Sequence, residues 1–170
     1  QQNNKMNITE ILKNEPAYRI KQIYKAWFDL EITDYTQIST LPKALREQLV
    51  DIPWMSTKLF VLQESKIDGT KKALLELSDG NKIETVLIER KPKKADEKTR
   101  YSVCISSQVG CAMKCSFCST GTLGFKRNLE VSEIVDQIRF WQKYIFEHID
   151  KEISIRNIVI MGQGEPLLNY

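Results

Sequence analysis

The stretch on which the interpretation of this sequence depends is Cys111-Ala112-Met113-Lys114-Cys115-Ser116-Phe117-Cys118. It holds three of the four cysteines of the 170-residue chain, with the spacing C-x3-C-x2-C. Thiolates this close along a chain can converge on one metal centre, and four of them make a closed [4Fe–4S] electron carrier. Three thiolates leave one iron open for a further ligand. The spacing therefore predicts a [4Fe–4S] cluster held by Cys111, Cys115 and Cys118.

The same cysteines have two simpler interpretations, a zinc site and a set of buried thiols. Zinc sites usually show paired Cys or Cys/His motifs with a fourth ligand, and the only histidine, His148, is distant in the sequence. Disulfides need an oxidising compartment. The polar opening residues 1–5 do not resemble a secretory signal. The iron–sulfur cluster is thus the favoured interpretation.

A glycine-rich motif follows an apolar stretch at 153–161. It reads Gly162-Gln163-Gly164-Glu165-Pro166. Glycines let a backbone approach a ligand closely, and a carboxylate there can bind the ammonium group of an amino acid. S-adenosylmethionine (SAM) exposes such a group. The simpler interpretation is a turn that ends a strand.

The segments around the cysteines resemble a known family. C-x3-C-x-aromatic-C, with Phe117 as the aromatic residue, is the signature of radical SAM enzymes, in which SAM binds the open iron. The segments 103–110 (VCISSQVG), 119–121 (STG), 124–129 (GFKRNL) and 161–170 (MGQGEPLLNY) are similar to those of the dual-specificity methyltransferases of adenine C2 in 23S ribosomal RNA and transfer RNA. The resemblance runs from about Leu41 to the last residue.

The resemblance implies a cofactor site and two catalytic residues. The three clustered cysteines would hold the [4Fe–4S] cluster, and SAM would contact Phe117, Gly164 and Glu165. Glu84 matches a carboxylate assigned as a proton acceptor, and Cys104 matches a cysteine that helps to resolve a protein–RNA adduct. By position alone, Glu84 is a carboxylate on a strand and Cys104 a small buried hydrophobic residue.

The family also has a methyl-carrying cysteine near its carboxyl terminus, whereas no cysteine follows Cys118 in this chain. We therefore expect the amino-terminal portion of a longer enzyme, without methyltransferase activity by itself. Gln163 replaces the methionine usual in the family, and we expect little effect from this change. The resemblance further implies RNA substrates, an electron donor such as flavodoxin or ferredoxin, and a monomer.

Apolar spacing predicts an α/β fold that begins with a small helical domain. Its expected range is 1–57, with helices at 9–13, 15–28 and 41–50. Leu41, Leu45 and Leu49 recur on one face of the last helix, and Thr40 is its expected N-cap. Ile20, Ile23, Tyr24 and Trp27 have the spacing of a helix core.

The remainder is expected to form a β-hairpin linker segment at 58–100 and the start of a radical SAM core at 101–170. Asp79-Gly80 between strand-like runs at 70–77 and 82–89 is a strong hairpin signal. A strand at 101–105, a loop at 106–123, a helix at 132–147 capped by Ser132 and a strand within 153–161 predict the first βαβ unit of a partial (β/α) barrel, truncated in this chain.

The charge and composition exclude few classes of protein. The net charge is +3, and the whole excess lies in 58–100, where Lys91, Lys93 and Lys94 cluster beside Pro92 in a polar loop. That loop is either a solvated segment or an edge that contacts RNA phosphates. No apolar run approaches the ~20 residues of a membrane span, and a cytoplasmic, reducing compartment is expected.

Two alternatives to the C2 methyltransferase stay open. The first is the antibiotic-resistance relative that methylates adenine C8 of ribosomal RNA; it usually carries alanine after the glutamate of the glycine motif, so Pro166 favours the C2 enzyme. The second is a non-catalytic iron–sulfur or zinc module that binds RNA.

Overall fold

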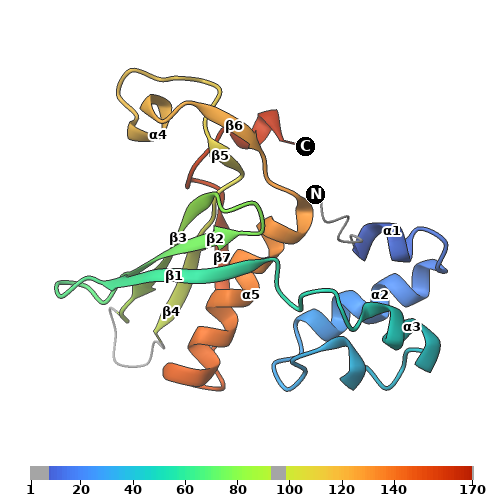
Figure 1. The fold of residues 1–170 in the computed structure, drawn as a ribbon. Coiled ribbons are helices and arrows are strands. Elements are labelled where there is room, and N and C mark those ends of the chain that lie inside the picture. The colour runs from blue at the N-terminus through green and yellow to red at the C-terminus, as the bar shows by residue number, and fades with distance from the viewer. Residues whose placement is uncertain (1–7, 93–98, 170) are drawn as a thin grey trace. The chain divides into compact units, whose positions relative to one another are not determined.

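The computed structural model describes residues 8–92 and 99–169 (Figure 1). The chain divides into two compact units, Gln1–Trp54 and Met55–Tyr170. Lys93 and Lys94 of the predicted basic loop lie outside the described residues.

The first unit is helical. It contains α1 (Ile8–Leu12), α2 (Ala17–Trp27), the 3-10 helix η1 (Tyr35–Gln37) and α3 (Lys43–Leu49). Leu41, Leu45 and Leu49 are all buried, as predicted. Only Leu45 and Leu49 lie on α3, because the helix begins two residues after Leu41. The prediction of Thr40 as the cap of α3 is wrong: the N-cap is Pro42, whose ring presets φ and which lacks the N–H that a helix start leaves unpaired.

The core of α2 is smaller than the expected apolar face, since Ile20 is only half-buried. Ile23 and Trp27 are buried, whereas Tyr24 is 48% exposed and its ring lies 5.1 Å from that of Trp27. A tyrosine can cover an apolar neighbour while its hydroxyl remains in water. Tyr24 therefore lines the edge of this core instead of filling it.

The second unit is built on a five-stranded sheet. The strand order is β1 (Thr57–Glu64), β2 (Lys71–Leu77), β3 (Lys82–Arg90), β4 (Arg100–Cys104) and β7 (Ile155–Val159). The first four strands pair antiparallel, and β4 pairs parallel with β7. The predicted hairpin is confirmed, with Gly80 at φ +80° in its turn. The parallel pair of the predicted βαβ unit is confirmed as well.

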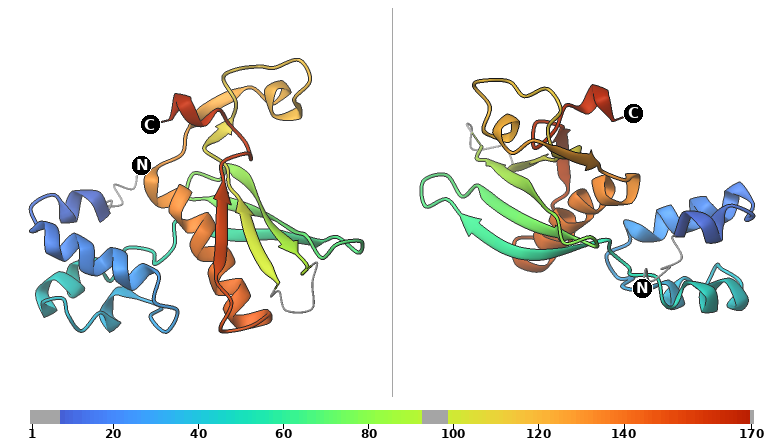
Figure 2. Two further views of the ribbon diagram at one scale, coloured as in Figure 1. Left: turned by 180° about the vertical axis from the view of Figure 1, so that it is seen from behind. Right: turned by 45° about the horizontal axis from the view of Figure 1, so that its top comes forward.

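One face of this sheet is covered by α5 (Val131–His148), as the views from front and back agree (Figures 1 and 2). Every second residue is buried in β2, in β4 and in the first two thirds of β3, as the pleat requires where one face is covered. Trp141 and Ile145 of α5 pack against this core fully buried. The indole N–H of Trp141 donates to Thr85 Oγ1 at 3.0 Å. Ile134 and Ile138 of α5 are half-buried against this core.

The cap predicted for α5 is wrong. The N-cap is Glu130, two residues before Ser132, and Glu130 forms a reciprocal capping box with Glu133. Such a box satisfies two unpaired amides at once, which a lone serine cannot do. The box places Glu133 at the buried start of the helix.

The segment predicted as one loop at 106–123 contains regular structure. A small antiparallel sheet forms from β5 (Gln108–Gly110) and β6 (Phe125–Asn128), and a short helix, α4 (Ser119–Thr122), lies between them. Strands of three and four residues carry no detectable periodicity. The strands of the segment 58–100 pair within the same sheet as β4 and β7. Its role as a linker stays a prediction.

None of the helices in the described part of the chain is both long enough and apolar enough to cross a membrane.

Candidate iron–sulfur and SAM-binding site

The cysteine loop, residues 111–124, is closed at its base by β5 and β6. The backbone N–H of Cys111 donates to the carbonyl of Gly124 at 3.0 Å. Gly110 lies at φ +76°, and a Cβ built on it would lie 1.7 Å from that same carbonyl oxygen. Only glycine fits this position, so the sequence Gly110-Cys111 is what permits the loop to close.

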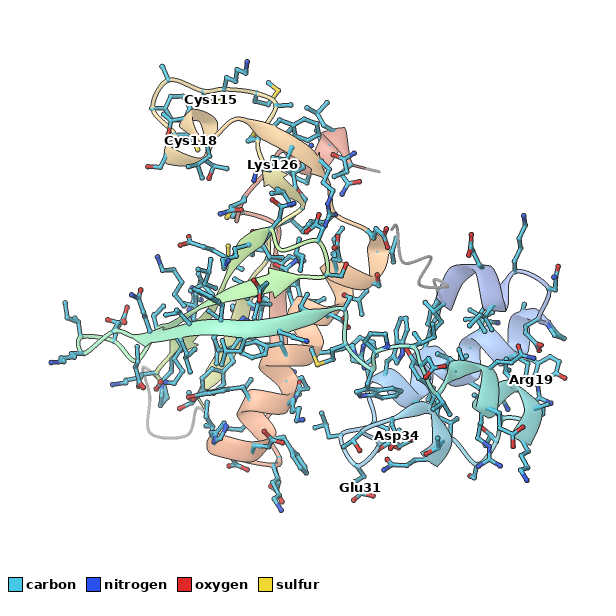
Figure 3. All side chains as sticks on the ribbon, in the orientation of Figure 1. Arg19, Glu31, Asp34, Cys115, Cys118 and Lys126 are labelled. Atoms are coloured by element: carbon cyan, nitrogen blue, oxygen red, sulfur yellow. The ribbon has the colours of Figure 1, made fainter. Side chains whose placement is uncertain are left out.

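Within the loop, Cys115 and Cys118 lie close to α4 (Figure 3). Cys118 N–H donates to the Cys115 carbonyl at 3.1 Å, and Gly121 N–H donates to the Cys118 carbonyl at 3.0 Å. A Cβ on Gly121 would lie 2.9 Å from the Cys115 carbonyl oxygen. Cys111 is buried, whereas Cys115 and Cys118 are half-buried.

The three thiols are not gathered around one point in this structure. No group of three His, Cys, Asp or Glu side chains able to hold a metal ion occurs among residues 8–92 and 99–169. The donor set itself fits an iron–sulfur cluster, since it supplies three cysteine sulfurs on one closed loop. The ligation by these cysteines therefore stays a prediction about the loop once it is loaded.

The electrostatics of the loop favour a thiolate at Cys118. Hydrogen bonds from the backbone N–H groups of Gly121 and Thr120 lower the pKa of the Cys118 thiol. The thiolate is the form that binds metal. Phe117, the aromatic residue of the signature, is 91% exposed, so it does not serve as a core residue of this unit.

The glycine–glutamate turn, residues 162–165, packs against the segment that follows β4. Gly162 N–H donates to the Ile105 carbonyl at 3.0 Å, and Gln163 N–H donates to Ser106 Oγ at 2.8 Å. The Gln163 carbonyl accepts from Ser107 N–H at 2.8 Å. Because residues 105–107 lead directly into the cysteine loop, the two sequence motifs lie at the same end of β4 and β7.

Gly164 is required by this packing. It lies at φ +102°, and a Cβ on it would fall 2.6 Å from Gln108 Cβ and 2.7 Å from Ser107 Oγ. The glycine therefore lets the turn pack closely against residues 107 and 108. The sequence predicts that this glycine allows close approach of a ligand, and that contact stays a prediction. Ser107 Oγ is buried and makes no hydrogen bond within the described residues.

Glu165 combines a local and a longer-range bond. Its carboxylate accepts from Leu167 N–H at 3.1 Å and so caps the 3-10 helix η2 (Pro166–Leu168). Its N–H donates to Gln108 Oε1 at 3.0 Å. The side chain is half-buried, and a half-exposed carboxylate can pair with an ammonium group that arrives from solvent.

The structure brings Glu84 and Cys104 to the same face of the sheet. Both alternate with buried residues, so they lie on the face opposite α5. Val86 pairs directly with Cys104, which makes Glu84 its diagonal neighbour, and such neighbours lie about 7–8 Å apart. The Glu84 carbonyl accepts from Ser106 Oγ at 2.6 Å. The two residues thus adjoin the turn and the start of the cysteine loop.

The surroundings of these two side chains differ. Glu84 forms an ion pair with Lys72 of β2 at 3.0 Å, with both side chains nearly half exposed. Burial raises the pKa of the Cys104 thiol, and a backbone hydrogen bond from Met161 partly offsets the rise. Cys104 is therefore held as a thiol at neutral pH, and the pKa of Cys118 is shifted in the opposite direction.

Sequence reasoning missed a network that anchors β6. Arg127 donates to both carboxylate oxygens of Glu133 at 2.7 and 2.8 Å and to Asp79 in the β2–β3 turn at 2.7 Å. The arginine lowers the pKa of Asp79 to about 2. Lys126, labelled in Figure 3, donates to Asn81 of the same turn at 2.8 Å. Nothing in the local sequence signals the contacts of Arg127 and Lys126 with the β2–β3 turn, because they join residues 48 and 45 positions apart.

Comparison with solved structures defines the class of fold. The chain superposes on a crystal structure of a radical SAM methyltransferase from Sphaerobacter thermophilus with a TM-score of 0.73 at 37% identity, over 95% of this chain and 45% of that one. The fold is therefore the radical SAM methyltransferase fold over the part matched. No family model matches the chain.

Curated relatives narrow the resemblance to one kind of enzyme. The chain is 40% identical over 158 residues to the probable dual-specificity RNA methyltransferase RlmN of Syntrophomonas wolfei and 44% identical over 155 residues to that of Lawsonia intracellularis. It is 44% identical over 170 residues to that of Dictyoglomus thermophilum. These matches cover 91–96% of this chain but only 43–44% of each relative. The predicted resemblance to the dual-specificity RNA methyltransferases is thus confirmed, and the chain spans less than half of their length.

Proposed function

We propose that this chain is the cluster-bearing and SAM-binding portion of a cytoplasmic methyltransferase that modifies C2 of adenine in 23S ribosomal RNA and transfer RNA. One observation carries the proposal: the glycine–glutamate turn is hydrogen-bonded to residues 105–107, which lead into the three-cysteine loop. A ligand that needs both motifs at once finds them at one end of the parallel strands, where α/β folds bind ligands.

In this proposal each group has a separate role. Cys111, Cys115 and Cys118 would hold a [4Fe–4S] cluster, which supplies the electron that cleaves SAM to a radical. Glu165 would bind the ammonium group of SAM. Phe117 and Gly164 are proposed as further contacts to SAM, Phe117 because its ring is exposed beside the cysteines.

Glu84 and Cys104 would act on the RNA at the open face of the sheet. The Glu84 carboxylate would accept the proton that leaves adenine C2, and Lys72, 3.0 Å away, would orient that carboxylate. The Cys104 thiol would resolve the protein–RNA adduct. Its raised pKa would keep the sulfur protonated until a base takes the proton. Electrons would come from a flavodoxin or ferredoxin.

The test is the methylation of adenine in cells that encode this chain. Deletion of the coding sequence is expected to remove 2-methyladenosine from 23S ribosomal RNA and transfer RNA, as measured by mass spectrometry of nucleosides. Unchanged 2-methyladenosine would contradict the proposal. Loss of 8-methyladenosine instead would assign the chain to the C8 reaction.

A further inference from the structure

We propose that Gln108 is the positioning residue that sets the glycine–glutamate turn against the cysteine loop, and that SAM binding depends on its side-chain amide. The inference rests on the proposed function, since it concerns the same pair of motifs. Gln108 is the first residue of β5, three positions before Cys111, and is 1% exposed.

The side chain of Gln108 joins two segments that are distant in sequence. Its amide oxygen accepts from Glu165 N–H at 3.0 Å, and its amide nitrogen donates to Asn128 Oδ1 at 2.8 Å. Its backbone N–H donates to the Gln163 carbonyl at 3.2 Å. Asn128 is the last residue of β6 and the cross-strand partner of Gln108. Gln108, which is part of β5, is therefore bonded both to the turn and to β6, the other strand that closes the cysteine loop.

Few other side chains could make these bonds. The position needs an acceptor for one group and a donor for another, and both partners are held by backbone or strand pairing. A carboxylate lacks the donor, and a methionine of similar length lacks the donor and offers only a weak sulfur acceptor. At a buried position, each lost partner leaves a polar group unsatisfied.

The consequence for SAM follows from the connection of the two motifs. A ligand that contacts both the cysteine loop and the turn binds best when their separation is already fixed. Loss of the Glu165 bond frees the Glu165 end of the turn, while the bonds at Gly162 and Gln163 and those that close the cysteine loop remain in place. We therefore expect weaker SAM binding with unchanged iron binding, a separation that a general loss of stability would not produce.

Gln142 supplies a matched control. Its amide also makes two hydrogen bonds between elements, donating to the Ile153 carbonyl at 3.2 Å and accepting from Ile155 N–H at 3.1 Å. It lies at the opposite end of β7 from the turn. Replacement of Gln142 removes the same number of bonds from the same unit without touching either motif.

The experiment compares Gln108→Met, Gln108→Glu and Gln142→Met in the 170-residue chain. Amide exchange of residues 162–165 is measured on the metal-free protein, and iron content and SAM affinity are measured after anaerobic reconstitution with iron and sulfide. For Gln108→Met we expect the Glu165 amide to exchange about tenfold faster, in line with one lost hydrogen bond. We also expect about tenfold weaker SAM binding at the iron content of the unmodified chain.

Gln108→Glu and Gln142→Met serve as controls for the result with Gln108→Met. Gln108→Glu keeps the acceptor for Glu165 N–H and loses the donor to Asn128, so its SAM affinity should lie between those of the unmodified chain and Gln108→Met. Gln142→Met should bind SAM as the unmodified chain does. If Gln108→Met does not fold, Gln108→Glu decides the matter, and SAM affinity equal to the unmodified chain would overturn the proposal.

Two further outcomes are distinguishable. If the unmodified chain binds iron and SAM while Gln108→Met does so equally well, or Gln142→Met weakens SAM binding as much, the role of Gln108 is wrong and the proposed function stands. If the unmodified chain binds neither iron nor SAM, the proposed function fails and this inference fails with it.

Discussion

Replacement of Gly164 by alanine probes the packing of the glycine–glutamate turn most directly. Two separate costs apply at this position. Its φ of +102° is unfavourable for any residue with a Cβ, at about 1–2 kcal/mol. The added methyl would also lie 2.6 Å from Gln108 Cβ and 2.7 Å from Gln108 N, and overpacking of this kind costs about 1–3 kcal/mol. The sum predicts a loss of about 2–5 kcal/mol in the free energy of unfolding.

Gly80 separates these two costs. It lies at φ +80° in the β2–β3 turn, and nothing lies within 4 Å of a Cβ built on it. Gly80→Ala therefore carries the conformational cost without the steric one, and about 1–2 kcal/mol is expected. Both glycines belong to the second unit, so the same cooperative unfolding reports on both variants.

The assay is urea unfolding of the chain and of the two variants, followed by circular dichroism. The expected order of stability is the unmodified chain, then Gly80→Ala, then Gly164→Ala. If Gly164→Ala were no less stable than Gly80→Ala, the turn would not be packed against residues 107 and 108 as described. The reasoning that links the two motifs would then be refuted.

Three further predictions follow from individual contacts. The pKa of Asp79 is lowered from 3.8 to about 2, so the stabilisation from this carboxylate is complete above pH 3.8 and is lost as the pH falls towards 2. In urea unfolding, the stability difference between the unmodified chain and Asp79→Asn should therefore shrink over that range. A constant difference would contradict the ion pair. Thr85→Val leaves the buried indole N–H of Trp141 without its acceptor and should cost about 1–3 kcal/mol in the free energy of unfolding, whereas an unchanged value would show that the bond contributes nothing. In the metal-free chain at neutral pH, iodoacetamide should modify Cys118 before Cys104, because the pKa of Cys118 is lowered and that of Cys104 is raised. Peptide mass spectrometry gives the order of modification. Faster modification of Cys104 would contradict the surroundings described for the two thiols.

Much of the fold could be read from local patterns. Asp79-Gly80 between two strand-like runs predicted the hairpin, because the turn needs a residue at positive φ. The apolar spacing of 132–147 predicted α5 to within one residue at each end. The parallel pairing of β4 with β7 followed from the strand–helix–strand order alone.

Other features depend on contacts that no local pattern encodes. β5 and β6 are too short to show a period, and they form because Gly110 allows their backbones to close at Gly124. Glu133 and Gln137 are buried on α5 despite their polarity, since Arg127 and the Ser106 backbone satisfy them. A prediction based on apolar spacing alone places such polar residues on the solvent-exposed side of the helix.

The candidate site shows the same division. The motifs themselves were visible in the sequence, and the structure brings the turn of Gly164 and Glu165 against the segment that enters the cysteine loop. The connection through Gln108 was not visible, because a single glutamine in the sequence carries no sign of its partners. The roles assigned to Glu84 and Cys104 stay predictions, although the two share one face of the sheet.

The central claim is that three cysteines hold a [4Fe–4S] cluster with one iron left for SAM. Its most direct test is electron paramagnetic resonance of the reduced, anaerobically reconstituted chain with and without SAM, alongside iron and sulfide analysis. The account predicts about four irons and four sulfides per chain, a cluster signal that changes when SAM is added, and loss of the signal in Cys115→Ala. Bound zinc without sulfide, or a cluster signal that SAM leaves unchanged, would contradict it.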